Sequence, residues 1–458
     1  MLKSSWQETF QQLRREFPVL TFEKYEFTWE KGRLRIFFTY HLGNRYTFRP
    51  EYTIPWRDFY CSPGGVEPFL PNLLFHIGLV ELISYWKAAC PPVVRILPHA
   101  LSDDQVNWWK RLWFYGLGEF FYRNGIEITE TDFMTVECGS EPIPGPFSFS
   151  SSEDVIVPVG GGKDSVVTLE LLGREANVIP LLLNPRKASL ETILTKGFTP
   201  SGYIHIERTI HPTLLELNKK GFLNGHTPFS ALLAFISLLG AVSSNCKYIA
   251  LSNESSANEA TLPGTGINHQ YSKSVGFEED FRDYTRKYIT TDAEYFSFLR
   301  PLNELQIARL FAGFPRYLPV FKSCNAGSKT DTWCGQCPKC LFTWIILSPF
   351  ISQDELRKIF GKDLLSDDSL RPILDQLTGI APEKPFECIG TIDEVNASLH
   401  HFIRTKGSKD LPGLLHYYTT LPVYQSGRFP DYDKLLHSFD RHHVPEQFIP
   451  VLKSVLYG

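Results

Sequence analysis

Three consecutive glycines followed by Lys-Asp-Ser are the residues of this sequence best suited to binding an anion. Residues 155–165 read Val-Ile-Val-Pro-Val-Gly-Gly-Gly-Lys-Asp-Ser, and an apolar run over 166–172 follows. This pattern predicts a strand over 155–159, a glycine turn and a helix over 165–174. Glycines let the backbone approach an anion closely, and the start of a helix supplies free N–H groups and partial positive charge. The segment therefore indicates a phosphate-binding loop.

Two common nucleotide-binding motifs do not fit this loop. A Walker A motif requires a glycine where Val157 stands and a hydroxyl residue where Asp164 stands. A dinucleotide-binding fingerprint requires a final glycine where Ser165 stands. A tight turn without a ligand is the simpler alternative, but Lys-Asp-Ser after three glycines is more than a turn requires.

The loop resembles the Ser-Gly-Gly-x-Asp-Ser loop of the PP-loop ATP pyrophosphatases. In that family the loop holds the β- and γ-phosphates of ATP as the leaving group, while AMP is transferred to a substrate oxygen, often a carboxylate. The resemblance implies a pyrophosphate cradle in which Lys163 adds positive charge and Asp164 orders the loop or bridges to Mg²⁺. Gly160 departs from the family pattern because it replaces the first Ser, which removes one hydroxyl contact. The residues that the resemblance assigns to the cradle are Gly160, Gly161, Gly162, Lys163, Asp164 and Ser165.

Composition restricts the class of protein. A chain of 458 residues predicts two or three domains and a core large enough for an enzyme. With 46 Lys and Arg against 50 Asp and Glu, the net charge of -4 argues against an open nucleic-acid surface. No signal peptide is visible, and the longest apolar run, 229–242, is too short to span a membrane. We therefore expect a cytoplasmic protein without a nucleic-acid partner or a membrane span.

Four clustered cysteines predict a structural zinc site. Cys334, Cys337 and Cys340 are separated by two residues each, and Cys324 lies ten positions before Cys334. This spacing fits a tetrahedral Zn²⁺ site with four thiolate ligands and no open position. Nine cysteines in total are an odd number, which suits a reducing compartment better than a disulfide framework. Buried free thiols and an iron–sulfur cluster are the alternatives.

The distribution of elements predicts an α/β protein. Strands over 155–159, 178–183, 203–207 and 247–251 alternate with helical segments, which favours a doubly wound parallel sheet. By resemblance this fold is of the PP-loop ATP pyrophosphatase, or adenine nucleotide α-hydrolase, type. A Pro- and Ser-rich linker over 139–152 marks a boundary after an aromatic-rich α+β domain that includes a hairpin at 33–48. We predict three parts: an N-terminal domain over 1–147, a nucleotide-binding domain over 153–345 and a helical C-terminal region over 346–458.

The carboxyl ends of the predicted parallel strands should face one crevice. Besides the glycine loop, Asn184 and the polar segment 252–259 fall at such ends. In that segment Asn253 is a candidate for nucleotide binding, and Glu254 and Glu259 are candidates for Mg²⁺ binding or proton transfer. A helix N-cap followed by a solvated turn is the simpler interpretation. Weaker candidates are two loop histidines as a base, His226 and His269, and five basic residues as ligands of phosphates or of a carboxylate, since most such side chains are simply solvated. The basic residues are Arg282, Arg286, Lys287, Arg300 and Lys322.

The whole chain resembles one PP-loop family, the MurL-type UDP-N-acetylmuramoyl-L-alanyl-L-glutamate epimerases. The resemblance lies in the Gly-Gly-Gly-Lys-Asp-Ser loop, the aromatic-rich segment 73–87, the segment 252–259 and the Cys-Gly-Gln-Cys-Pro-Lys-Cys knuckle. It implies a UDP-MurNAc-dipeptide substrate that the N-terminal domain contacts. It also implies ATP, Mg²⁺ and a structural Zn²⁺, with release of AMP and pyrophosphate.

Epimerisation of the α-carbon next to a free carboxylate is difficult, because the enolate formed by loss of the α-proton would carry two negative charges. Adenylation of the α-carboxylate makes the α-proton far more acidic, so the use of ATP is chemically coherent. The candidates for the epimerising base are Glu254, Glu259 and His269. The alternatives are another PP-loop enzyme that activates a carboxylate or a base for amidation or thiolation, an ATP sensor, and a zinc-dependent nucleic-acid-binding protein.

Overall fold

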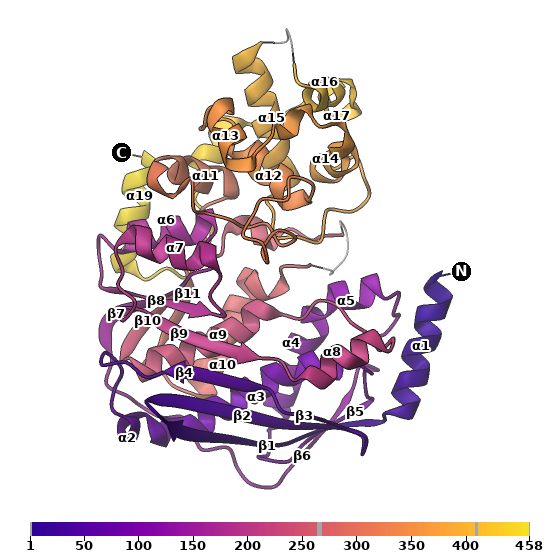
Figure 1. Ribbon diagram of the computed structural model, residues 1–458, viewed down its shortest axis with the longest axis vertical. Coiled ribbons are helices and arrows are strands. Elements are labelled where there is room, and N and C mark those ends of the chain that lie inside the picture. The colour runs from indigo at the N-terminus through magenta and orange to yellow at the C-terminus, as the bar shows by residue number, and fades with distance from the viewer. Residues whose placement is uncertain (1, 263–267, 408–410, 458) are drawn as a thin grey trace. The chain divides into compact units, whose positions relative to one another are not determined.

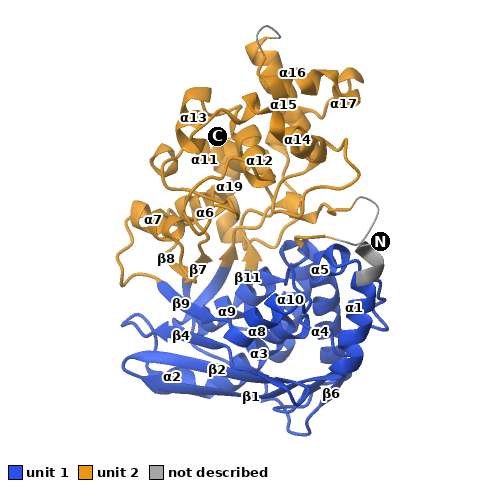
Figure 2. Ribbon diagram, turned by 45° about the vertical axis from the view of Figure 1, so that its right-hand side comes forward, with its two compact units in different colours: residues 1–156, 204–249, 271–295 blue, residues 157–203, 250–270, 296–458 orange. Residues whose placement is uncertain are grey.

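The computed structural model describes residues 2–262, 268–407 and 411–457. It is a mixed α/β structure with a large sheet and many helices (Figure 1). The chain forms two compact units, which Figure 2 distinguishes by colour. Unit 1 contains described residues from 1–156, 204–249 and 271–295, and unit 2 contains those from 157–203, 250–270 and 296–458. Each unit therefore joins segments that are distant in the sequence.

Unit 1 contains a mixed sheet. β1 pairs with β2, β2 with both β3 and β4, and β4 with β9, all antiparallel, whereas β5 pairs in parallel with β1 and β6. The hairpin predicted at 33–48 is confirmed, since Tyr40 opposes Phe48. The strands are β1 (Val19–Glu30), β2 (Arg33–Leu42), β3 (Tyr46–Phe48), β4 (Glu51–Pro55), β5 (Val93–Ile96), β6 (Thr135–Cys138) and β9 (Ile204–Thr209).

Unit 1 contains a long apolar helix, α3 (Leu70–Trp86), which packs against α4 (Asp103–Gly116), α9 (Phe229–Ser243), β1 and β2. The segment Pro63–Trp86 is long and apolar enough to cross a membrane, with a mean hydropathy of 1.4, but 78% of its apolar 18-residue window is buried inside the protein. That burial is the pattern of a core helix. The other helices are α1 (Leu2–Glu16), α2 (Pro63–Val66), η1 (Glu67–Phe69), α4 (Asp103–Gly116), α5 (Gly118–Arg123), α8 (Pro212–Lys219), α9 (Phe229–Ser243), η3 (Tyr271–Lys273) and α10 (Val275–Tyr288).

Unit 2 begins near the end of β7 (Ser152–Pro158) and includes β8 (Val178–Leu183). The boundary between the units also falls within β10 (Cys246–Leu251) and β11 (Glu294–Ser297). The first helix of the unit, α6 (Lys163–Leu172), packs against α7 (Lys187–Lys196), α11 (Glu304–Ala312) and α19 (Ile449–Tyr457). Helices from three later parts of the chain thus pack against the helix that follows the glycine loop.

The C-terminal region is helical, as the sequence predicts. α12 contacts α11, α14 and α15, so this region forms one packed group rather than a string of separate helices. The remaining helices of unit 2 are α7 (Lys187–Lys196), η2 (Ser255–Asn258), α11 (Glu304–Ala312), η4 (Pro315–Tyr317), α12 (Pro338–Leu347), α13 (Gln353–Phe360), η5 (Leu364–Ser366), η6 (Asp368–Leu370), α14 (Arg371–Thr378), α15 (Ile392–Lys406), α16 (Gly413–Thr420), α17 (Pro422–Gln425), α18 (Tyr432–His437), η7 (Glu446–Phe448) and α19 (Ile449–Tyr457).

The alternation of strands and helices after residue 150 is confirmed. β7, β8, β9 and β10 lie at the four predicted positions, with helices between them. β10 pairs in parallel with β7, and Tyr248 is registered with Val155 although the two residues lie far apart in the sequence. The sheet as a whole is mixed, because the strands of unit 1 include antiparallel pairs.

Candidate functional site

The predicted glycine loop joins β7 to α6 in unit 2. Gly162 is the N-cap of α6, with an extended backbone at φ -90° and ψ 173°, and no side chain caps the helix there. The hydroxyl of Ser165 donates a hydrogen bond to the Gly162 carbonyl over 3.0 Å, which closes the first turn. Because the first N–H groups of a helix have no partner within the helix, this end can accept an anion.

The three glycines of the loop have different constraints. Gly161 has a φ of +88°, and a Cβ there would lie 2.6 Å from the backbone nitrogen of Ser189. Its carbonyl also accepts a hydrogen bond from the Lys322 N–H over 2.9 Å. Gly160 is exposed, and a Cβ there would meet nothing within 4 Å. Only glycine fits position 161, whereas the serine that the PP-loop pattern has at position 160 would fit without a clash.

Next to the loop, three carboxylates meet around one lysine. Asp164, Glu254 and Glu304 each place a carboxylate oxygen within 4.8 Å of the others, and we call them the carboxylate cluster. The Lys163 ammonium pairs with Asp164 Oδ1 at 2.5 Å and with Glu304 Oε2. Glu254 is only 1% exposed, and its Oε2 has no hydrogen-bond partner among the described residues.

The electrostatics of the carboxylate cluster follow from its burial. Burial alone would lower the pKa of Lys163, but the adjacent carboxylates of Asp164 and Glu304 outweigh it and raise that pKa, so the ammonium stays charged. Burial raises the pKa of Glu304 well above its usual value; Lys163 offsets part of this, and Asp164 and Glu254 raise it further. The cluster therefore contains more carboxyl groups than its one lysine can keep ionised.

Glu254 is held in place through its backbone. The fully buried Arg300 donates from Nη1 to the Glu254 carbonyl over 2.6 Å and from Nη2 to the Ser297 hydroxyl over 3.2 Å. The Asn253 amide also donates to Ser297 Oγ, over 3.0 Å. Arg300, which the sequence suggested as a phosphate ligand, thus positions the polar segment at the end of β10.

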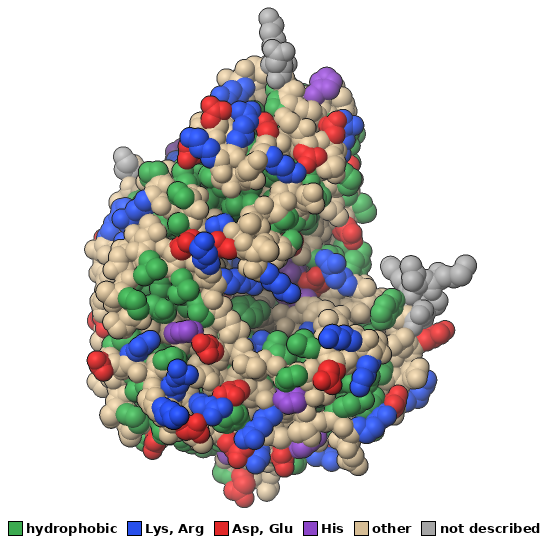
Figure 3. Space-filling view, viewed as in Figure 1, with side chains coloured by type: hydrophobic (Ala, Val, Ile, Leu, Met, Phe, Trp, Pro, Cys, Tyr) green, Lys and Arg blue, Asp and Glu red, His purple; other side chains and the backbone are tan. Residues whose placement is uncertain are grey.

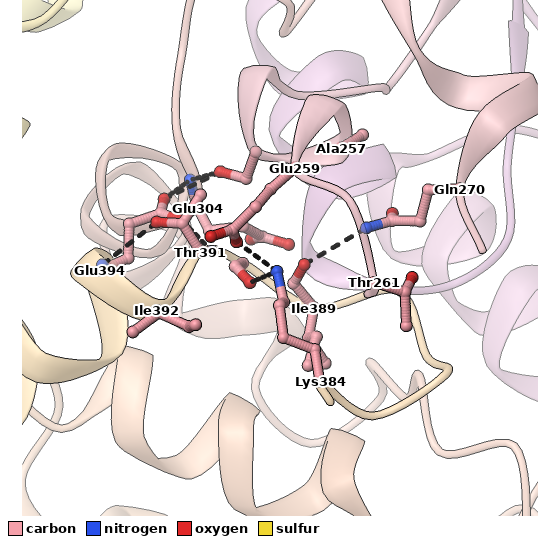
Figure 4. A network of polar contacts seen from close by, with 12 residues as sticks. Ala257, Glu259, Thr261, Gln270, Glu304, Lys384, Ile389, Thr391, Ile392 and Glu394 are labelled. Carbon is pink, nitrogen blue, oxygen red and sulfur yellow. Dashed lines mark hydrogen bonds and ion pairs between the residues drawn. The ribbon is translucent and has the colours of Figure 1, made fainter. Parts of the chain in front are cut away.

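A buried glutamate from the C-terminal region fixes the carboxylate cluster from the other side. Glu394 Oε1 accepts hydrogen bonds from Ser256 Oγ at 2.9 Å and from the Glu304 N–H at 2.5 Å, while its Oε2 accepts from the N–H and hydroxyl of Thr391 (Figure 4). It therefore caps the N-terminus of α11 with negative charge. Glu304 begins α11, so Glu394 sets where the Glu304 side chain starts.

Glu259 and His269, two of the predicted catalytic residues, belong to unit 2 and are half-buried. The Glu259 carboxylate pairs with the buried ammonium of Lys384, which also donates to the Gly390 carbonyl over 3.0 Å (Figure 4). The backbone N–H of His269 donates to the Thr261 hydroxyl over 3.0 Å.

The remaining residues that the sequence predicted for the site lie outside the carboxylate cluster. Asn184 is exposed at the end of β8, with a φ of +48°. Lys322 pairs with Asp331 at 3.2 Å. His226 belongs to unit 1 and has the Glu119 carboxylate 3.4 Å from its Nδ1. Three predicted basic residues also belong to unit 1, namely Arg282, Arg286 and Lys287.

The four predicted zinc ligands come together in unit 2. All four sulfur atoms lie within 4.8 Å of one another, and the closest pairs are Cys324–Cys337 at 3.7 Å, Cys334–Cys340 at 3.7 Å and Cys337–Cys340 at 3.5 Å. A tetrahedron with Zn–S bonds of about 2.3 Å places its sulfurs about 3.8 Å apart, whereas a disulfide places them about 2.0 Å apart. The cysteines are free thiols spaced for a tetrahedral metal ion.

Sequence reasoning missed three residues of this region: Glu304, Lys384 and Glu394. A signal existed for two of them, since Asn303 with Gln306 and Thr391 with Glu394 form capping boxes that mark helix starts. Nothing local in the sequence indicates that both helix starts meet the segment 252–259.

Comparison with known proteins identifies the family. The family model described as the MurL N-terminal domain matches residues 11–298. The model described as the MurL C-terminal domain matches residues 320–425. The chain belongs to the MurL epimerase family. Its glycine loop and carboxylate cluster fall within the first match, except for Glu304, and its cysteine cluster falls within the second.

Three curated relatives of this MurL family member are named UDP-N-acetyl-alpha-D-muramoyl-L-alanyl-L-glutamate epimerase. The protein from Xanthomonas oryzae pv. oryzae is 36% identical over 69% of the chain and 70% of its own length. The protein from a Micromonospora species is 35% identical over 75% of the chain and 77% of its own length. The protein from Salinispora tropica is 33% identical over 88% of each chain. No solved structure matches the chain.

Proposed function

We propose that this MurL family member converts the terminal L-Glu of UDP-N-acetylmuramoyl-L-alanyl-L-glutamate to D-Glu, using ATP, in peptidoglycan precursor synthesis. The observation that carries the proposal is the similarity, over 69–88% of the chain, to three relatives named for this activity. The glycine loop supports the use of ATP, because Gly161 has a positive φ and the start of α6 has no side-chain cap. A doubly wound nucleotide-binding fold of the PP-loop type is part of this proposal.

The proposed reaction has three steps. First, an oxygen of the substrate α-carboxylate attacks the α-phosphorus of ATP, and pyrophosphate leaves. Second, a base removes the α-proton, which the adenylate ester has made acidic, and an acid returns a proton to the opposite face. Third, water attacks the acyl carbon, and AMP leaves with the bridging oxygen. The net change is epimerisation coupled to hydrolysis of ATP to AMP and pyrophosphate.

In this reaction the residues of the loop bind the departing pyrophosphate. Backbone N–H groups at residues 160–165 and the ammonium of Lys163 would contact its oxygens. Gly160 leaves room for a phosphate, since no atom lies within 4 Å of the position that its Cβ would take. This assignment extends to Asn253, which we propose contributes to nucleotide binding from the end of β10.

Mg²⁺ is the proposed cation of the reaction, and the carboxylate cluster fits it. Carboxylate oxygens are the ligands that Mg²⁺ prefers, and Asp164, Glu254 and Glu304 offer three within 4.8 Å of one another. The unpartnered Oε2 of the buried Glu254 is an acceptor that a cation would satisfy. When bound, the cation would neutralise charge that develops on the phosphates.

We propose that Glu259 and His269 move the α-proton, with Glu254 as a third candidate. Glu259 and His269 are half-buried, which leaves part of each side chain accessible to a substrate. Glu254 is almost fully buried in the carboxylate cluster, so a role in holding Mg²⁺ suits it better. Replacement of the base should stop exchange of the α-proton while adenylation continues. Glu259→Gln and His269→Gln, assayed for both steps, would distinguish the two residues.

We propose that the cysteine cluster holds a structural Zn²⁺. The sulfur–sulfur distances of 3.5–3.7 Å support a closed tetrahedral site. Cys337 is the N-cap of α12 and Cys340 lies in that helix, so the metal would fasten the start of α12 to the preceding loop. This site would contribute to folding rather than to the chemistry.

We also propose that the protein is cytoplasmic and binds no nucleic acid. On the face shown in Figure 3, Lys and Arg side chains are interspersed with Asp and Glu. Such mixing offers no continuous basic surface for a phosphate backbone on that face.

The test of the proposed function is an incubation with ATP, Mg²⁺ and UDP-MurNAc-L-Ala-L-Glu in deuterated water. We expect AMP, pyrophosphate and a product that carries D-Glu with deuterium at Cα. AMP without deuterium would mean activation without proton abstraction and would point to a ligase. A product of unchanged chirality with no AMP would refute the proposal.

A further inference from the structure

Lys163 occupies the position that a metal cation would take in the carboxylate cluster. Its ammonium contacts two of the three carboxylates, those of Asp164 and Glu304. Its side chain is only 7% exposed, so water does not replace these partners. The ammonium of Lys163 is therefore a cation already bound by the cluster.

When its carboxylates are ionised, the cluster lacks as much positive charge as one divalent cation carries. Three carboxylates face one ammonium, which leaves an excess of two negative charges when all are ionised. Uncompensated charge in a buried site is costly. The excess lies on the side of Glu254, whose Oε2 is buried without a partner among the described residues.

Lys163 is also the first residue of α6, directly after Gly162. Its flexible four-carbon side chain starts at the loop where the phosphates of ATP are expected. An ammonium released from the carboxylates could therefore turn toward these phosphates without any change in the backbone. In its present position, Lys163 is engaged by the carboxylates instead.

We propose that the carboxylate cluster exchanges Lys163 for a divalent cation. Without a cation, the Lys163 ammonium fills the cluster. When the cation binds, Asp164, Glu254 and Glu304 become its ligands, and Lys163 is released to the glycine loop. One binding event then brings two positively charged groups to a phosphate, the divalent cation and the ammonium of the freed lysine. The use made of the freed lysine rests on the proposed function, whereas the exchange itself requires only the metal.

The exchange predicts that a metal ion alone exposes a buried lysine. The full-length protein without nucleotide would be treated with acetic anhydride, in MgCl₂ or in NaCl of equal ionic strength, and acetylation quantified by mass spectrometry. Acetylation of Lys163 should rise several-fold in MgCl₂. Lys384 is an internal control, because it is also buried and paired with a carboxylate but lies outside the cluster. Unchanged or reduced acetylation of Lys163 would overturn the proposal.

Binding of Mn²⁺ alone tests the ligands and the competitor. Free Mn²⁺ would be measured by electron paramagnetic resonance in titrations of the wild type and its variants. Glu254→Gln and Glu304→Gln should each weaken binding by about tenfold or more, whereas Lys163→Met should tighten it because the competing cation is gone. The matched control is Glu170→Gln, which alters a carboxylate of α6 that is buried and paired with Lys196 and Arg316.

Each outcome of these experiments is decisive. Equal Mn²⁺ affinity in the wild type and both Gln variants would remove the cluster as the site, and weaker binding by Lys163→Met would show that the lysine does not compete. The acetylation experiment uses the wild type, so misfolding of a variant cannot decide it. Loss of the exchange with intact ATP-dependent epimerisation would leave the proposed function standing. Intact exchange without epimerisation would leave only the cation site.

Discussion

The cysteine cluster and the carboxylate cluster both gather ligand groups within 4.8 Å, yet the chain assembles them in different ways. The cysteine cluster comes from 17 consecutive positions, Cys324 to Cys340. The carboxylate cluster comes from the starts of α6 and α11 and the end of β10, and 141 positions separate Lys163 from Glu304. The first site depends on a local knuckle, and the second depends on the packing of unit 2.

The two clusters also differ in how their charge is balanced. The cysteine cluster offers only thiols, so a metal with four thiolate ligands would leave no position open for a substrate. The carboxylate cluster already contains an ammonium and therefore has a stable form without metal. A closed site suits a permanent structural metal, whereas a site with its own lysine suits a cation that arrives with the substrate.

The largest expected effect comes from breaking the proposed zinc site. Cys340→Ser should reduce the zinc content from about one ion per chain and lower the free energy of unfolding by several kcal/mol, since such sites contribute roughly 10 kcal/mol. Metal analysis and urea denaturation would measure both. The control is Cys246→Ser, since Cys246 is buried but lies outside the cluster. Zinc content unaffected by Cys340→Ser would contradict the assignment.

Breaking the carboxylate cluster should affect catalysis rather than folding. Asp164→Ala is expected to lower the rate of pyrophosphate release about a thousandfold, as for loss of a preorganised electrostatic group. Its zinc content should equal that of the wild type. A quantitative pyrophosphate assay with metal analysis on the same sample makes the comparison. Full activity of Asp164→Ala would refute the assignment of the loop.

Gly161 offers a test of the backbone conformation of the glycine loop. Gly161→Ala should lower the free energy of unfolding by about 3 kcal/mol, because it forces a side chain into a positive φ and places a Cβ 2.6 Å from the Ser189 nitrogen. Urea denaturation would measure the loss. A stability equal to that of the wild type would mean that the loop has a different conformation in solution.

A smaller effect is expected where the C-terminal region supports the carboxylate cluster. Glu394→Gln replaces an acceptor of hydrogen bonds with a side chain that must direct its NH₂ group at N–H and O–H donors. We expect a loss of about 2 kcal/mol in the free energy of unfolding. A double-mutant cycle with Ser256→Ala should show that the two effects are not additive. Full additivity would contradict the hydrogen bond between these residues.

The smallest effect is expected at Gly160. Gly160→Ser restores the serine of the PP-loop pattern and should change the free energy of unfolding by less than about 0.5 kcal/mol, because its Cβ would meet nothing within 4 Å. The KM for ATP should stay the same or fall. A large loss of stability would show that the open space at Gly160 is filled in solution.

Much of the fold follows from local patterns in the sequence. The hairpin at 33–48, the four strands after residue 150 and the helical C-terminal region lie where hydrophobic periodicity predicts them. The cysteine cluster follows from spacing alone, since a knuckle with two intervening residues places its thiols on one side. These features depend on residues close in sequence, so their patterns are visible without the fold.

The rest could not be predicted because it depends on distant contacts. Glu304 and Glu394 look like ordinary helix-start residues, and only the packing of α11 and α15 brings them to Ser256. Arg300 has the charge of a phosphate ligand, but its burial directs it to the Glu254 carbonyl. The pairing of Lys163 with Glu304 likewise requires contact between α6 and α11. Residue type alone cannot distinguish these roles.

The most direct test of the central claim follows one oxygen atom. The substrate would be UDP-MurNAc-L-Ala-L-Glu with ¹⁸O at both oxygens of the α-carboxylate of its Glu residue, incubated with the protein, ATP and Mg²⁺ in unlabelled water. If the carboxylate is adenylated and water then attacks the acyl carbon, mass spectrometry will find one ¹⁸O atom in each AMP formed. Epimerised product with AMP that contains no ¹⁸O would contradict activation of the carboxylate by this route.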